Sequence, residues 1–184
     1  MQGCATSLIF NTTTVSEVIL VNELDEAIGR MEKMAAHSSG VLHRAFSVFI
    51  FNSKQEMLLQ QRALKKYHSG GLWTNACCSH PLPGEDIEAA AHRRLLEEMG
   101  FDTALQKAFS FTYHTSFSNG LVENEYDHVF IGRYDGEIIP VANEVKDYCF
   151  MPLADIRDSI ASHPAKYTEW FKIAFPKLEK YLAV

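Results

Sequence analysis

Hydrophobic and polar residues follow one another along the chain in a pattern that predicts mostly short strands. Runs rich in β-branched and aromatic residues, bounded by turn-forming residues, are typical of strands. The strongest run is 43–51 (HRAFSVFIF), and the polar stretch that follows it predicts the turn of a hairpin. The same criteria predict strands at 18–21, 57–62, 109–117, 121–134 and 144–151. Two further segments, 27–34 and 73–80, fit either strands or irregular ordered chain.

Helices are predicted at 86–99, 153–161 and 168–182. The first has the strongest signals, because acidic residues stand at its start, where the helix dipole favours negative charge. Gly100 follows its last residue, where a left-handed cap is favoured. Many strands with one mid-chain helix and a helical tail make this an α+β protein.

Length and composition limit the organisation of the chain. The sequence has 184 residues, of which 47% are hydrophobic and 22% charged. At about 150 residues per domain, this length predicts one domain. Residues 1–16 are rich in Thr and unpatterned, so we expect a flexible lead-in followed by a single domain at 17–184.

Charge, apolar runs and cysteines restrict the partners and the compartment. The net charge of −6 disfavours nucleic acid and anionic membranes as partners. Apolar runs are far too short to span a bilayer, and the N-terminus lacks a signal peptide. Four cysteines, two of them adjacent, form no disulfide framework. We therefore expect a cytoplasmic protein without nucleic-acid or membrane partners. We also expect it to act as a monomer.

Paired acidic residues and scattered histidines are the first candidate chemistry. Glu123 and Glu125 are two apart on a predicted strand, so both carboxylates point to one face of the sheet. A divalent cation with imidazole partners would relieve their mutual repulsion. Spacing alone also allows an exposed acidic edge without an ion.

The segment Trp73–Pro81 (WTNACCSHP) is the second candidate. A cysteine two residues before a histidine suits a reactive thiol or a metal ligand. A thiol pKa of about 8.5 is close enough to neutrality for proton transfer. The alternative is that both cysteines are small core residues, as free cysteines usually are.

The helix 86–99 carries two charge pairs at helical spacing. Arg94 and Glu98 are four residues apart, as are Arg93 and Glu97. They are either ordinary ion pairs on a solvated face or a carboxylate for Mg²⁺ beside an arginine for phosphate. Further cations that the fold could bring to such a site are Lys33, Arg62, Lys65 and Lys66.

Six blocks, in this order and spacing, together resemble the type 1 isopentenyl-diphosphate Δ-isomerases, a branch of the Nudix fold. They are EKMAAH (32–37), LHRAFS (42–47), QRALKK (61–66), LWTNACCSHP (72–81), RRLLEEMGF (93–101) and GLVENEYDHVF (120–130). The resemblance covers roughly residues 17–175. It implies a mixed sheet flanked by helices, an α/β/α sandwich, with C-terminal helices. It also implies an enzyme of isoprenoid biosynthesis that converts isopentenyl diphosphate to dimethylallyl diphosphate through a tertiary carbocation, without flavin or nicotinamide.

The Nudix signature, G-x5-E-x7-R-E-U-x-E-E-x-G-U with U apolar, is only partly matched. Ser79 stands at the first glycine, and Arg94 replaces the glutamate that follows the arginine. Hydrolases of this fold use that glutamate for their metals, so its loss disfavours a diphosphate hydrolase. The remaining signature positions are occupied by Glu85, Arg93, Leu95, Glu97, Glu98, Gly100 and Phe101.

The resemblance also implies roles for individual residues. One Mn²⁺, Zn²⁺ or Mg²⁺ would be held by His37, His43, His80, Glu123 and Glu125. One Mg²⁺ would arrive with the substrate diphosphate and bind Glu98 and the backbone carbonyl of Cys78. The diphosphate would contact Lys33, Arg62, Lys66, Ser79 and Arg94. The catalytic residues would be Cys78, Glu125, Tyr113 and Trp170. Cys78 and Glu125 would transfer the protons, Tyr113 would hydrogen-bond Glu125, and Trp170 would stabilise the cation.

Two other functions stay open at this point. One is a Nudix-type diphosphate hydrolase. The other is a binding module in which Cys77, Cys78 and His80 hold a structural zinc, although such sites usually have four ligands in close pairs. For the isomerase we expect a pocket with a charged mouth for the diphosphate and an apolar floor for the five-carbon chain.

Overall fold

The computed structural model describes residues 16–66 and 68–183, so nearly all of the predicted lead-in lies outside the described residues. Within these residues, nine strands and four α-helices follow one another. The strands are β1 (Glu17–Val21), β2 (Ala27–Glu32), β3 (His43–Phe51), β4 (Met57–Arg62), β5 (Trp73–Asn75), β6 (Cys77–Ser79), β7 (Leu105–Ser116), β8 (Val122–Arg133) and β9 (Val145–Met151). The helices are α1 (Lys33–Ser39), α2 (Ile87–Met99), α3 (Leu153–Ser162) and α4 (Glu169–Leu182), with a 3-10 turn at Pro164–Lys166.

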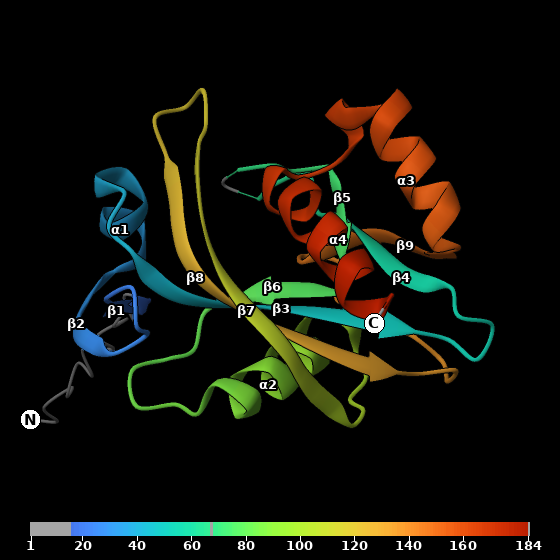
Figure 1. Cartoon of the computed structure of the whole chain (residues 1–184), viewed down its shortest axis with the longest axis horizontal. Helices are drawn as coiled ribbons and strands as arrows, with labels where there is room; N and C mark the ends of the chain where they lie inside the picture. Colours follow the sequence, from blue (N-terminus) through green and yellow to red (C-terminus); the bar gives the residue numbers. More distant parts are fainter. Residues whose placement is uncertain (1–15, 67, 184) are drawn as a thin grey trace, which may run out of the picture.

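All nine strands belong to one mixed sheet with β3 near its centre (Figure 1). β3 pairs with β8 in parallel and with β1, β4 and β6 in antiparallel orientation. β7 and β8 form a long antiparallel hairpin, and β9 extends the sheet beside β4. The predicted α+β class with a mixed sheet is confirmed.

Helices cover both faces of this sheet, as Figure 1 shows for α2 and α4. Side chains alternate between the faces along β3, because successive residues of a strand point in opposite directions. Phe46, Val48 and Ile50 pack in one core cluster with residues of α2. Phe49 and Phe51 pack in a second cluster with residues of α3 and α4. Each face of β3 therefore contributes to a separate hydrophobic core.

The prediction for 27–34 missed a helix. The strand β2 ends at Glu32, and α1 begins at once. The Glu32 carboxylate accepts hydrogen bonds from the backbone N–H groups of Met34 and Ala35, which caps the helix. Gly40, at φ 64°, ends it in a left-handed cap. Seven residues are too few for a clear helical period, so the pattern alone did not reveal α1.

The other elements agree with the sequence to within a few residues at their ends. Asp86 caps α2 by accepting from the backbone N–H groups of Glu88 and Ala89, and Gly100 closes it at φ 75°. The segment 73–80 forms two short strands, β5 and β6, separated by Ala76. Within the described residues, no helix combines the length and the apolar character needed to cross a membrane.

Candidate active site

The candidate site lies on the sheet face covered by α4, where strand register brings four predicted residues together. His43 on β3 lies opposite Glu125 on β8, and Tyr113 on β7 lies opposite Glu125 from the other side. Cys78 on β6 lies opposite Ser47 of β3. Since His43 and Ser47 are four residues apart, they share one face of the strand, and their partners share it too.

Three histidines and one carboxylate converge there. His37, His43, His80 and Glu125 each present one ligand atom, and these atoms all lie within 4.8 Å of one another. Nε2 of His80 lies 2.9 Å from Oε1 of Glu125, and Nε2 of His43 lies 3.5 Å from it. The structure thus unites four of the five residues predicted to bind the first ion. The fifth, Glu123, belongs to a neighbouring group with His37 and His68.

Backbone carbonyls orient two of these imidazoles. Nδ1 of His37 donates to the carbonyl of Lys33 at 2.7 Å, and Nδ1 of His43 donates to the carbonyl of Val41 at 2.8 Å. Each bond fixes the proton on Nδ1 and leaves the Nε2 lone pair to face the cluster, as in many metal-binding histidines. Among the described residues, the buried Nδ1 of His80 has no hydrogen-bond partner.

The two glutamates have opposite electrostatic environments. Burial and the nearby Glu125 carboxylate raise the pKa of Glu123 well above its usual value. Burial also disfavours the charge of Glu125, but the adjacent imidazoles of His43 and His80 outweigh it and hold the Glu125 pKa well below its usual value. The Tyr113 hydroxyl donates to both carboxylates, at 2.6 Å to Glu125 and 3.1 Å to Glu123.

The adjacent cysteines point to opposite faces of the sheet. Cys77 is fully buried in the core cluster under α2, whereas Cys78 faces the other cluster and lines a cavity with Glu125 and Tyr113. The Cys78 thiol lies 3.0 Å from Oδ1 of Asn75, to which it donates, and 3.2 Å from the Ser47 hydroxyl. Burial raises the Cys78 pKa well above its usual value, so the thiol is protonated at neutral pH.

A polar concavity of about 330 Å³ adjoins the cluster. Lys33, Lys66, Ser79 and Arg94, which are predicted to contact the diphosphate, line it together with His80. Arg94 also pairs with Glu98 at 2.7 Å, and Lys66 forms an ion pair with Glu144. This concavity matches the expected charged mouth.

Arg62 and Trp170 lie deeper, at the inner cavity. The Arg62 guanidinium sits 5.0 Å from the centre of the Trp170 ring, in a cation–π contact. Both residues line the same cavity as Cys78. Glu98 stands apart from the His/Glu groups of the described chain. Its carboxylate accepts hydrogen bonds from Arg94 and from Gln60, the latter at 3.0 Å.

The inner cavity itself is small, about 30 Å³, and both polar and aromatic side chains line it. An open apolar floor was expected, but at this volume the described residues leave no room for one between the lining side chains of Trp170, Tyr113 and His68. A five-carbon chain requires these side chains to move apart. His68 was missed by the sequence analysis: it lies in a polar, glycine-bearing loop, and no spacing relates it to the other histidines.

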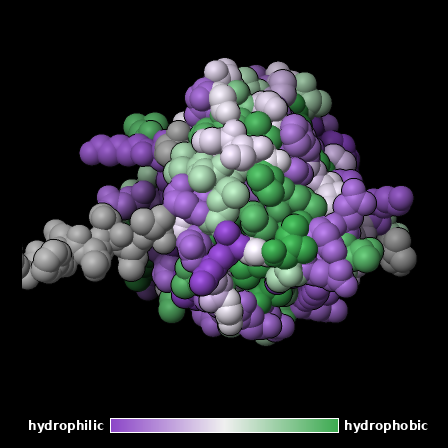
Figure 2. Space-filling view, turned by 90° about the vertical axis from the view of Figure 1, so that its left-hand side faces the viewer, coloured by the Kyte–Doolittle hydropathy of each residue, from purple (hydrophilic) through white to green (hydrophobic). Residues whose placement is uncertain are grey.

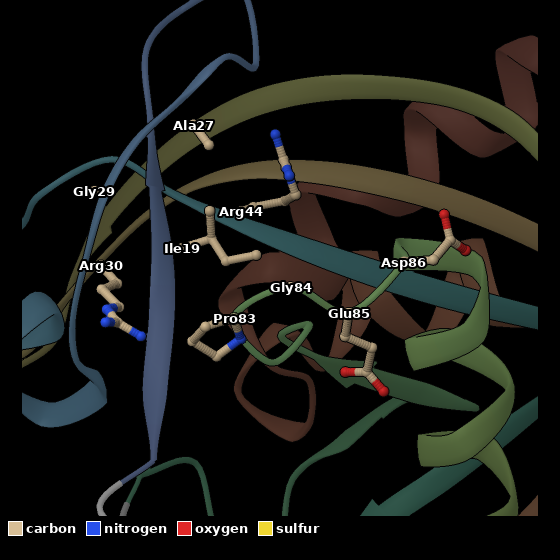
Figure 3. A pocket seen from close by; sticks show the side chains of 9 residues that line it. All are labelled: Ile19, Ala27, Gly29, Arg30, Arg44, Pro83, Gly84, Glu85 and Asp86. Carbon is tan, nitrogen blue, oxygen red and sulfur yellow. The ribbon is translucent and has the colours of Figure 1, made fainter.

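A larger concavity, of about 820 Å³, lies between the β1–β2 hairpin and the loop before α2 (Figure 3). Its charged groups have structural partners. Arg44 pairs with Asp25 at 2.7 Å, Glu85 pairs with Arg93 at 2.6 Å, and Asp86 caps α2. Among the residues that the structure describes, the 820 Å³ concavity gathers no set of catalytic groups comparable to the His/Glu cluster. On the side of the molecule seen in Figure 2, hydrophobic residues gather in one area framed by hydrophilic ones.

The fold is that of a Nudix-type protein, and comparisons with known proteins agree. A family model described as NUDIX domain matches residues 41–171. The crystal structure of DR0079 from Deinococcus radiodurans superposes with a TM-score of 0.71 at 19% identity, covering 86% of this chain and 96% of that one.

Two curated relatives show to which branch of the Nudix-fold proteins the chain belongs. "Isopentenyl-diphosphate Delta-isomerase 2" of Photorhabdus laumondii is 55% identical over 84% of this chain and 88% of its own length. "Isopentenyl-diphosphate Delta-isomerase" of Pectobacterium atrosepticum is 48% identical over 91% of this chain and 93% of its own length. The chain belongs to the isopentenyl-diphosphate Δ-isomerase family of Nudix-fold proteins.

Proposed function

We propose that this protein is an enzyme that isomerises isopentenyl diphosphate to dimethylallyl diphosphate for isoprenoid biosynthesis. One observation carries the proposal: Cys78 and the Tyr113-bound carboxylate of Glu125 line the same buried cavity. Moving a double bond within a substrate requires one proton to be added and another to be removed. Two proton-transferring groups beside one cavity supply this chemistry.

A divalent ion fits the residues of the cluster. Imidazole nitrogens and carboxylate oxygens suit Zn²⁺ and Mn²⁺, and the buried Nε2 of His43 forms no hydrogen bond within the described chain. The residues that would hold the ion are His37, His43, His80, Glu123 and Glu125. When bound, the ion would act as a Lewis acid that makes the coordinated carboxyl group of Glu125 a stronger proton donor.

Cys78 and Glu125 would act on opposite faces of the alkene. One of them protonates the terminal carbon, which produces a tertiary carbocation, and the other removes a proton from C2. Tyr113 holds the Glu125 carboxyl group by its 2.6 Å hydrogen bond. Asn75 and Ser47 hold the Cys78 thiol in the same way. The face of Trp170 away from Arg62 would stabilise the cation.

The diphosphate would bind at the charged mouth. Lys33, Lys66, Ser79 and Arg94 line it, and Arg62, which lines the inner cavity, would contact the diphosphate from there. Glu98 and the backbone carbonyl of Cys78 would hold a second Mg²⁺, which would neutralise part of the charge of the diphosphate. Displacement of Glu144 from Lys66 by the substrate would free that cation.

We propose that residues 17–184 act as one domain and as a monomer in the cytoplasm. The proposed partner is the small-molecule diphosphate, and neither nucleic acid nor membrane takes part. The reaction moves a double bond without net oxidation, so it requires neither flavin nor nicotinamide.

A conversion assay tests this function. Purified protein is incubated with isopentenyl diphosphate and Mg²⁺, and the products are separated by chromatography while free phosphate is measured. We expect dimethylallyl diphosphate from the wild type, none from Glu125→Gln, and no phosphate from either. Release of phosphate or diphosphate instead would indicate a Nudix-type hydrolase.

A further inference from the structure

His68 is a buried histidine of this cavity to which the family resemblance gives no role. It lies in the loop between β4 and β5, with 8% of its surface exposed. Its ring stacks on Phe117 at a centroid distance of 5.1 Å and meets the edge of Trp170 at 5.6 Å. The Arg62 guanidinium donates to its backbone carbonyl at 3.3 Å. These contacts hold the imidazole in one place.

One ring nitrogen of His68, Nε2, faces the His/Glu cluster. Nε2 of His68 lies 3.4 Å from Oε1 of Glu123, and the His68 ring centre lies 6.3 Å from that of His37. Ligand atoms of His37, His68 and Glu123 all lie within 4.8 Å of one another. In an octahedral site with bonds of about 2.1 Å, neighbouring ligand atoms are about 3 Å apart and opposite ones about 4 Å apart. A small inward shift of the side chains would bring atoms at the 4.8 Å limit into the range of one ion.

The two ligand groups share His37, and this limits how many ions they can hold. Nδ1 of His37 donates to the carbonyl of Lys33, so only Nε2 has a lone pair for a metal. One lone pair binds one ion. A separate ion at His37, His68 and Glu123 would therefore take His37 away from the first group. Both groups are better explained as parts of one coordination sphere.

We propose that His68 is a further ligand of the single divalent ion in this cluster, binding through Nε2 on the side of Glu123. The inference rests on the proposed function in one respect, namely that the cluster binds a metal. With His68 the donor set becomes four imidazoles and two carboxylates. So many nitrogen ligands favour Zn²⁺, Co²⁺ or Mn²⁺ over Mg²⁺, which prefers oxygen.

Cobalt binding to the metal-free protein tests this assignment without any activity measurement. Co²⁺ is titrated into protein stripped of metal, and its visible absorption and affinity are recorded. His68→Phe keeps an aromatic ring between Phe117 and Trp170 but has no nitrogen, and His68→Gln serves if that variant does not fold. His114→Ala, which removes an exposed histidine of β7, is the matched control.

The inference predicts one equivalent of Co²⁺ in the wild type and in His114→Ala. It predicts an affinity at least ~10-fold weaker in His68→Phe, with a shifted spectrum because one nitrogen ligand is lost. Equal affinity and an unchanged spectrum in His68→Phe would overturn the role of His68 while leaving the cluster intact. Binding of two equivalents that both require His68 would overturn the single shared ion. Failure of the wild type to bind Co²⁺ would instead overturn the metal site of the proposed function.

Discussion

Replacing each of the adjacent cysteines by alanine should separate stability from catalysis. Cys77 is fully buried under α2, so Cys77→Ala removes a core sulfur and leaves a small cavity. We expect a loss of about 1–2 kcal/mol in the free energy of unfolding. For a chain of this size that lowers the Tm by roughly 2–8 °C. Turnover should stay within a few-fold of the wild type.

Cys78→Ala should have the opposite effect. Its neighbours keep other partners, because Asn75 Oδ1 still accepts from Thr74 and the Ser47 hydroxyl still donates to Asp127. The stability loss should therefore be below about 1 kcal/mol. Loss of a proton-transferring group should lower kcat by at least ~10²–10⁴-fold, which corresponds to about 3–5 kcal/mol in the activation free energy.

Thermal unfolding and isomerase turnover, measured on both variants, check this contrast. Because neighbouring residues of a strand point to opposite faces, we expect Cys77→Ala to be destabilised but active and Cys78→Ala to be stable but inactive. Retained turnover in Cys78→Ala, or its abolition in a folded Cys77→Ala, would refute the assignment of the two thiols to opposite faces and separate roles.

Three further predictions concern the cluster and the core. Tyr113→Phe removes the hydrogen bonds to Glu123 and Glu125, so kcat should fall at least ~10-fold while the affinity for substrate stays similar; an unchanged kcat would contradict the role of the hydroxyl. Chelation should abolish turnover, and added Zn²⁺ or Mn²⁺ should restore it, whereas full activity in metal-free protein would contradict the metal site. Burial lowers the pKa of His128 to about 4 from an ordinary 6.5, so the folded state binds fewer protons than the unfolded state between these values. The free energy of unfolding should therefore fall, by up to about 3 kcal/mol from this group, as pH drops from about 6.5 to about 4. Denaturant unfolding at pH 7, 5 and 4 should show a shallower decline for His128→Gln than for the wild type, and an identical decline would exclude His128 as a cause.

The sequence predicted the regular elements well where local chemistry determines them. The hairpin of β3 and β4 and the helix α2 follow from β-branched runs, a polar turn and clear caps. The helix α1 was missed because its cap is a glutamate at the end of a strand and its length is seven residues. Yet α1 is the element that places Lys33 and His37 one turn apart on the same side.

The site was predictable residue by residue only through the resemblance. Spacing indicated that Glu123 and Glu125 share a face, but it could not bring His37, His43 and His80 to them. That step depends on the parallel register of β3 with β8, in which His43 lies opposite Glu125. Such long-range pairing leaves no local pattern.

The position of His68 in the site was even less predictable from local sequence patterns. Its loop has no hydrophobic period, and its position against Phe117 and Trp170 is set by tertiary packing. Cys77 and Cys78 were distinguishable in principle, because a two-residue period sends neighbours to opposite faces. Deciding which face carries the site required the pairing of β6 with β3.

The most direct test of the central claim is proton NMR of isopentenyl diphosphate with the metal-loaded protein and Mg²⁺ in D₂O, without flavin or nicotinamide. The account predicts dimethylallyl diphosphate that carries deuterium in its methyl groups, because the proton added to the terminal carbon comes from a side chain that exchanges with solvent. Intact substrate from folded, metal-loaded protein, or hydrolysis to an alcohol and diphosphate, would contradict it.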